Sequence, residues 1–163
     1  VAHRLIYTYD RKDLYFVQIG HFDRETPKLQ KKLQELKLEE HFAFYNFIDD
    51  ASSYMPAFDV FALTSQSEGL PNVLYEAAYY KVPIVSTNVG GISEMLQHNE
   101  SAFLAEAFNP LELAEHIISL LENKELAKQF TERAYNNLMN NFTTKQMAEK
   151  TLVEYKTILH GQL

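Results

Sequence analysis

Short apolar runs alternate with helix-forming segments along most of this sequence, and this alternation limits the chain to a small set of folds. Strands pair in parallel through right-handed crossovers when helices separate them. Runs as apolar as these are typical of strands buried on both faces. The pattern predicts an α/β domain with a doubly wound parallel sheet. Its strands are expected at residues 14–19, 42–48 (with an exit loop), 59–64, 83–87 and 102–106.

The helices are marked by start signals and by leucines at helical spacing. The first residues are typical of the end of a helix that leads into strand 14–19, so we predict that residues 1–163 are one domain of a longer protein. Helices are expected from Thr26 through Leu36, at 52–57, 72–80 and 92–97, and as a helical tail from Pro110 onward, with breaks near 123 and 140–144. The last helix, 146–160, places Leu152, Tyr155 and Leu159 on one stripe.

The composition fits one compact acidic domain. Among 163 residues, 46% are hydrophobic and 23% charged, which allows a real core. The net charge of −7 argues against a nucleic-acid partner, which usually requires a basic face. The chain has no cysteine, and its six histidines lack the spacing of metal ligands. The neighbouring carboxylates Asp49-Asp50 are expected to cap a helix and not to bind a metal. We therefore expect a cytoplasmic protein without a metal site.

The segment from Ser65 to Asn72 leaves an expected strand and enters an expected helix. In an open parallel sheet, ligands bind beyond the C-terminal ends of the strands. The N–H groups at a helix start lack partners within the helix and carry partial positive charge. Gly69 allows backbone to approach a ligand closely. We expect the helix start at Pro71 and Asn72 to bind an anion such as a phosphate or diphosphate.

Two carboxylates flank this helix start. Glu68 precedes the turn, and Glu76 lies one helical turn beyond Asn72. Contact of both carboxylates with a diphosphate would be repulsive at low dielectric, whereas a carboxylate accepts hydrogen bonds well from the two hydroxyls of a vicinal diol. The ligand that fits is a nucleoside diphosphate-sugar. Taken singly, either glutamate is more often a solvated surface residue, and only their order and spacing favour this ligand.

The sequence SEGLPNVLYEAAYYKVPIVSTNVGGISEML, residues 67–96, resembles the E-x7-E region of retaining glycosyltransferases of the GT-B fold, in the group 1 set (family 4). The resemblance continues into YFVQIG at 15–20, into 39–65 and into 109–143, so it covers nearly the whole chain. It implies a Rossmann-like, donor-binding C-terminal domain of a hexosyltransferase that acts in polysaccharide biosynthesis.

The resemblance also implies roles for single residues. Glu76 matches the glutamate that holds the donor ribose hydroxyls, and Glu68 matches the one at the transferred sugar and the reacting site. The family needs no metal cofactor, because helix-end amides and basic side chains take up the charge of the departing diphosphate. Backbone contacts to the sugar and diphosphate are implied for Gly69, Leu70, Pro71 and Asn72, and contacts to the base for Asn46, Phe47 and Ile48.

Asn46 and Lys81 depart from the family pattern, which usually has glycine at both positions. Asparagine tolerates positive φ, and Lys81 can form a left-handed helix cap at some cost. The family's Arg/Lys pair follows a first strand that we do not find here. We therefore expect that strand, the pair and the N-terminal acceptor domain to belong to a longer protein, and we expect no transferase activity from this chain alone.

The expected partners are the nucleotide-sugar donor and the protein's own N-terminal domain, through which peripheral membrane association is also possible. The acceptor would be a saccharide, a lipid or a protein. Two alternative functions stay open: a degenerate, non-catalytic GT-B binding domain, and a GT-B nucleotide-sugar epimerase. A phosphorylase would require a cofactor-bearing lysine context, which the sequence lacks.

Overall fold

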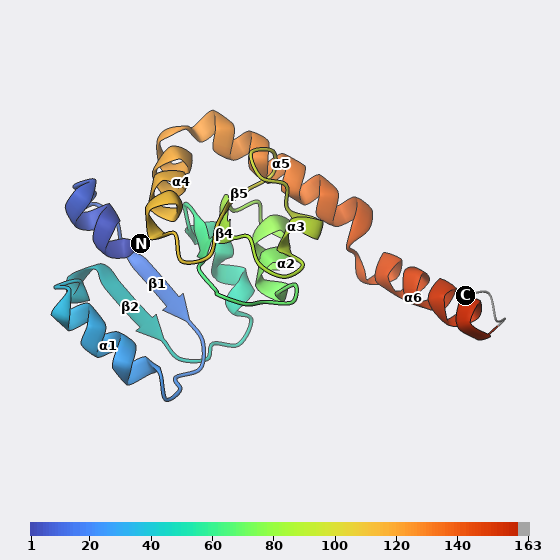
Figure 1. The fold of residues 1–163 in the computed structure, drawn as a ribbon, viewed down its shortest axis with the longest axis horizontal. Coiled ribbons are helices and arrows are strands. Elements are labelled where there is room, and N and C mark those ends of the chain that lie inside the picture. The colour runs from blue at the N-terminus through green and yellow to red at the C-terminus, as the bar shows by residue number, and fades with distance from the viewer. Residues whose placement is uncertain (160–163) are drawn as a thin grey trace.

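The computed structural model describes residues 1–159, and its strands form two parallel sheets (Figure 1). In one sheet β1 (Phe16–Ile19) pairs with β2 (Phe42–Tyr45). In the other, β4 (Ile84–Thr87) lies between β3 (Phe61–Leu63) and β5 (Phe103–Ala105). A helix or helical turn connects each strand to the next. The predicted α/β fold with parallel strands is therefore confirmed.

Except for the short turn at Glu39–His41, which was not predicted, the helical elements lie where the sequence pattern places them. Asn109 and Asn123 begin two of them, because each side chain accepts a hydrogen bond from an N–H group in the first turn. The elements are the π-helical turn η1 (Arg4–Thr8), α1 (Thr26–Glu35), the 3₁₀ turns η2 (Glu39–His41) and η3 (Ala51–Ala57), α2 (Asn72–Tyr79), α3 (Ile92–Met95), α4 (Pro110–Glu122), α5 (Lys124–Asn141) and α6 (Thr144–Leu159).

Helix α6 is the last part of the helical tail, and it extends away from the rest of the domain (Figure 1). It has no buried residue. Leu152, Tyr155 and Leu159, which share the expected stripe, are all more than half exposed. Within residues 1–159, no helix combines the length and apolar character that a membrane span requires.

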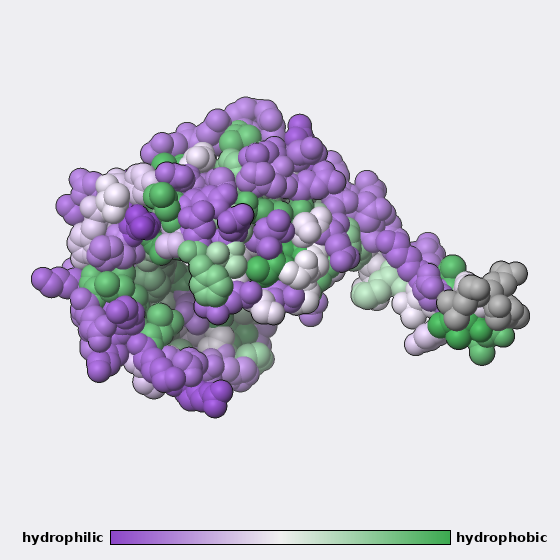
Figure 2. Space-filling view, in the orientation of Figure 1, coloured by the Kyte–Doolittle hydropathy of each residue, from purple (hydrophilic) through white to green (hydrophobic). Residues whose placement is uncertain are grey.

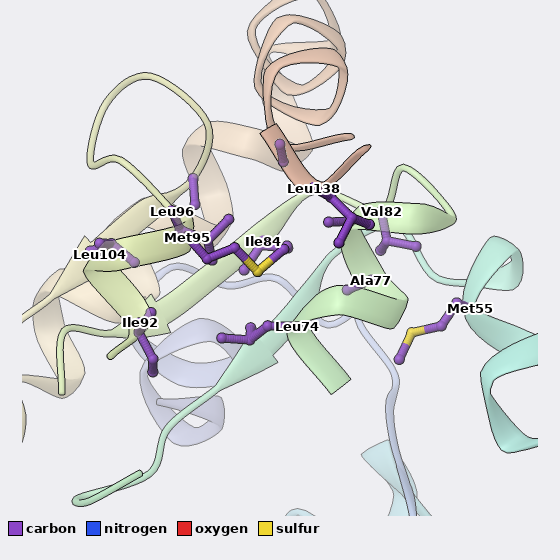
Figure 3. Packing of buried hydrophobic residues seen from close by; sticks show 13 residues of the cluster. Met55, Leu74, Ala77, Val82, Ile84, Ile92, Met95, Leu96, Leu104 and Leu138 are labelled. Carbon is purple, nitrogen blue, oxygen red and sulfur yellow. The ribbon is translucent and has the colours of Figure 1, made fainter. Parts of the chain in front are cut away.

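Strand β4 lies between two apolar clusters, one on each face of its sheet. All four of its residues are buried. Ile84 belongs to the cluster formed with α2, α3 and α5, whereas Val85 belongs to the cluster formed with η1 and α4. Figure 3 shows the first cluster, to which α2 contributes Leu74 and Ala77. This packing fixes α2 on the sheet and so determines where the helix begins.

The sheet differs from the sequence prediction in two respects. The strands are shorter than expected, because turns and side-chain contacts replace strand pairing at their ends; the N–H of Leu14, for example, donates to the Arg11 carbonyl at 3.2 Å. The expected single sheet is also divided between β1 and β3, because no strand within residues 1–159 pairs with both.

Lys81 confirms the predicted left-handed cap at the end of α2. Its φ is 55°, and the N–H groups of Lys81 and Val82 donate to the carbonyls of Ala78 and Ala77, which is the Schellman arrangement. The Lys81 ammonium lies 2.8 Å from a Glu132 carboxylate oxygen.

Lys81→Ala removes this ion pair and keeps the backbone strain, whereas Lys81→Gly removes both. We expect the glycine variant to be about 1 kcal/mol more stable than the alanine variant in urea denaturation. Equal stabilities would contradict the claim that the left-handed backbone at position 81 is strained.

We expect the folded protein to lose stability in mild acid because of His116. Its ring stacks on Phe103 with centroids 4.3 Å apart, and among residues 1–159 its buried Nε2 has no hydrogen-bond partner. Burial lowers the pKa of His116, an effect that nearby Glu112 opposes and His98 reinforces. The unfolded chain therefore binds the proton more readily, so stability declines as pH falls below about 6.5. We expect His116→Phe to reduce the decline in unfolding free energy between about pH 7.5 and pH 5.5, measured by urea titration. If the variant loses as much unfolding free energy over this pH range as the parent protein, His116 does not cause the loss of stability.

Candidate functional site

The loop at residues 65–71 connects the end of β3 to α2 and presents the start of that helix to solvent. Asn72 is exposed, and the N-terminal cap residue Pro71 provides no side-chain acceptor. Within residues 1–159, the N–H groups of Asn72 and Val73 have no hydrogen-bond partner, whereas the N–H of Leu74 donates to the Pro71 carbonyl. The start of α2 therefore carries free N–H donors and a partial positive charge.

Glu68 and Glu76 lie on either side of this helix start in the chain. Both side chains are half-buried. Glu76 is on α2 one turn beyond Asn72, next to the buried residue Ala77. Among the described residues, neither carboxylate has a hydrogen-bond or ion-pair partner. Both glutamates are therefore available to accept hydrogen bonds from a ligand.

A second loop, residues 87–91 after β4, holds the first loop in place. The hydroxyl of Thr87 donates to the Ser65 carbonyl at 2.7 Å, and the N–H of Gly91 donates to the Gly69 carbonyl at 2.7 Å. Between these bonds Gly90 has φ 58°, and a Cβ on it would lie 1.9 Å from the Glu68 carbonyl oxygen. The backbone around Glu68 is thus positioned by direct contact with this loop. The paired glycines are visible in the sequence, but the contact of Gly90 with the Glu68 backbone is not.

The loop at Asn46, Phe47 and Ile48 follows β2 and contacts the loop after β1. The Asn46 Oδ1 accepts hydrogen bonds from the N–H of Phe22 at 3.2 Å and of Phe47 at 2.8 Å. Asn46 does not have positive φ, so the tolerance of asparagine for positive φ is not what allows it to replace the family's glycine. Its side chain instead joins two neighbouring loops. His21 and Phe47 stack beside it with ring centroids 4.9 Å apart.

The predicted site residues therefore form two groups. One group comprises Glu68, Gly69, Leu70, Pro71, Asn72 and Glu76 around the start of α2, and the other comprises Asn46, Phe47 and Ile48. No hydrogen bond within residues 1–159 joins the two groups, and they follow strands of different sheets. Two surface depressions, one beside η1 and η2 and one along α6, lie away from both groups.

Comparison with known proteins identifies relatives along most of the chain. Residues 2–137 match the family model of glycosyl transferases group 1. N-acetyl-alpha-D-glucosaminyl L-malate synthase of Bacillus anthracis is 30% identical over 131 residues, which are 80% of this chain and 33% of that protein. The chain thus spans about a third of the length of the curated relatives it matches.

Solved structures of the same family share the fold. The HepE protein of Anabaena, in complex with UDP, has a TM-score of 0.80 and 25% identity over 93% of this chain and 44% of its own. The C-terminal domain of a group 1 glycosyl transferase from Francisella tularensis has a TM-score of 0.74 and 21% identity over 87% of this chain and 76% of its own. The chain belongs to the group 1 glycosyltransferase family and has the fold of a GT-B C-terminal domain.

Proposed function

We propose that this chain is the donor-binding domain of a retaining hexosyltransferase. The observation that carries the proposal is the exposed start of α2, whose free N–H groups lie in the chain between the unpaired carboxylates of Glu68 and Glu76. The HepE structures in complex with UDP and with UDP-glucose support a nucleoside diphosphate-sugar as the ligand.

In this proposal each group at the start of α2 has one role. The N–H groups of Asn72 and Val73 bind the diphosphate and stabilise the negative charge that develops on it as the sugar departs. Glu76 accepts hydrogen bonds from the ribose hydroxyls, and Glu68 accepts them from the transferred sugar. These donors supply the charge stabilisation without a metal ion.

Transfer itself requires more than these residues. The chain spans about a third of its relatives, and we propose that the acceptor binds to an N-terminal domain of the longer protein. We expect this chain alone to show no transfer with common nucleotide-sugars, and the longer, cytoplasmic protein to give a product with the anomeric configuration of the donor. An inverted product would contradict the retaining mechanism.

Calorimetric titration of the longer protein with UDP, GDP and ADP, alone and as their glucose conjugates, tests the proposal. We expect one nucleoside diphosphate to bind, and Glu76→Ala to weaken that binding. Failure of every nucleotide to bind would contradict the function. Interconversion of the donor sugar without transfer would indicate an epimerase, and binding without turnover on any acceptor would indicate a non-catalytic binding domain.

A further inference from the structure

Phe108, in the loop between β5 and α4, combines two unfavourable properties. Its side chain is 76% exposed, and its backbone has a φ of 64°. Left-handed backbone is costly for a residue with a Cβ and is rare for bulky residues. The other non-glycine residues with positive φ within residues 1–159 are aspartate, asparagine or lysine. Neither burial of the ring nor backbone preference therefore accounts for a phenylalanine at this position.

Hydrogen bonds hold the loop in this conformation. The Asn109 side chain accepts from the N–H of Glu112 at 3.2 Å and donates to the Glu112 carboxylate at 2.9 Å. The same carboxylate accepts from the N–H of Glu106 at 3.2 Å. The Phe108 ring is thus presented to solvent by a fixed backbone. Strained residues that the surrounding structure holds in place cluster at active sites and ligand clamps.

This loop, residues 106–109, lies at the same edge of the sheet as the start of α2. β5 pairs with β4 in parallel, and just beyond this pairing the N–H of Asn88 donates to the Ala105 carbonyl at 2.7 Å. The loop at 87–91 in turn contacts the loop that carries Glu68. Since neighbouring strands are about 4.8 Å apart, β5 lies about 10 Å from β3. A short oligosaccharide can span this distance.

The groups around Phe108 favour a neutral partner that is rich in hydroxyls. The segments after β4 and β5, residues 87–94 and 105–112, contain three glutamates and no lysine, arginine or histidine. Their charge disfavours an anionic partner. Asn88 and Glu106 are exposed, and within residues 1–159 their side chains have no hydrogen-bond partner. An amide and a carboxylate of this kind can bind hydroxyl groups.

The apolar surface at Phe108 is too small for a protein partner. Leu111 is also exposed, but Glu106 and Glu112 flank the pair in the chain. Figure 2 shows a mainly hydrophilic surface over α4 and α5, interrupted by small apolar groups. A stable protein interface buries about 800 Å² on each partner. A single ring bordered by polar groups instead suits a sugar, whose C–H groups pack on an aromatic face while its hydroxyls form hydrogen bonds.

We propose that Phe108 stacks on a neutral saccharide, which is the acceptor of the proposed transfer. The N-terminal domain of the longer protein holds the rest of this acceptor. The inference rests on the proposed function, because the acceptor has to reach the reacting site at this edge of the sheet. Phe108 then contributes to the choice of acceptor and takes no part in donor binding.

Fluorine NMR of the longer protein, with 4-fluorophenylalanine in place of phenylalanine, tests this contact. Maltotriose and N,N′,N″-triacetylchitotriose serve as neutral probes. We expect at least one of them to shift the Phe108 signal, which Phe108→Ala identifies by its absence, and the shift to saturate with concentration. In calorimetric titration, Phe108→Ala and Phe108→Gly should each weaken that trisaccharide about tenfold. Phe108→Trp should retain most of the affinity, and no variant should change nucleoside diphosphate binding.

The alanine and glycine variants also separate the ring from the backbone strain. Phe108→Ala removes the ring alone, whereas Phe108→Gly removes the ring and the strain. We therefore expect the urea midpoint of the glycine variant to be about 0.3–1 M higher than that of the alanine variant. Equal losses of trisaccharide binding at different stabilities would assign the contact to the ring.

Three results would overturn the contact. The first is that neither trisaccharide shifts the Phe108 signal, and the second is that Phe108→Gly binds both as the parent protein does. The third is that the ring is shielded from a dissolved paramagnetic agent before any saccharide is added, because another part of the longer protein would then cover it. Failure of every nucleotide to bind, with the trisaccharide contact intact, would contradict the proposed function and leave Phe108 as a saccharide contact.

Discussion

Gly90→Ala is expected to weaken nucleoside diphosphate binding about tenfold or more and to lower the free energy of unfolding by about 2 kcal/mol. The left-handed backbone at Gly90 penalises any Cβ by about 1–2 kcal/mol. The new Cβ would also lie 1.9 Å from the Glu68 carbonyl oxygen, so one of the two loops must move. Isothermal titration calorimetry and urea denaturation measure the two effects.

Gly69→Ala is the matched control for stability. A Cβ on Gly69 meets no atom within 4 Å, and Gly69 does not require positive φ. We expect its unfolding free energy to stay within about 0.5 kcal/mol of the parent. If Gly90→Ala leaves both stability and binding at the level of the parent protein, residues 87–91 do not position the loop that carries Glu68.

Glu76→Gln is expected to weaken binding of the nucleoside diphosphate and of its sugar conjugate about 10- to 150-fold each. A carboxylate that accepts hydrogen bonds from hydroxyls contributes about 1.5–3 kcal/mol, and glutamine keeps the shape of the side chain without its charge. Glu76 is half-buried, and within residues 1–159 no protein group pairs with it. Titration of the longer protein with both ligands gives the two dissociation constants.

Glu68→Gln serves as the matched variant, since it removes the same charge from the other side of the helix start. It is expected to weaken only the sugar conjugate, because Glu68 is proposed to contact the sugar and not the ribose. Its carboxylate also has no partner within residues 1–159, so both substitutions start from comparable environments. Equal losses of plain nucleoside diphosphate binding in the two variants would contradict the separate roles.

The order of elements could be predicted from the sequence because its signals are local. Thr26-Pro27 and Asn109-Pro110 begin helices where the structure has them, within one residue. The apolar runs at β4 and β5 became fully buried strands, because burial between helices satisfies both of their faces. Lys81 was predictable from the resemblance, because the family usually has glycine at this helix end and such a glycine commonly forms a left-handed cap.

The contacts that shape the candidate site were not predictable from local patterns. The Thr87 hydroxyl reaches Ser65, 22 residues earlier, and Asn46 reaches Phe22, 24 residues earlier. Both bonds depend on which strands are neighbours, which composition and spacing do not specify. The local pattern also does not show that β1 pairs on one side only, because an apolar run looks the same whether one or two strands pair with it.

A crystal structure of the longer protein with its bound nucleoside diphosphate-sugar tests the central claim most directly. We expect a diphosphate oxygen about 2.7–3.2 Å from the N–H groups of Asn72 and Val73, with Glu76 on the ribose hydroxyls and Glu68 on the sugar. A nucleotide bound elsewhere, or one whose ribose and sugar contact neither glutamate, would contradict the account.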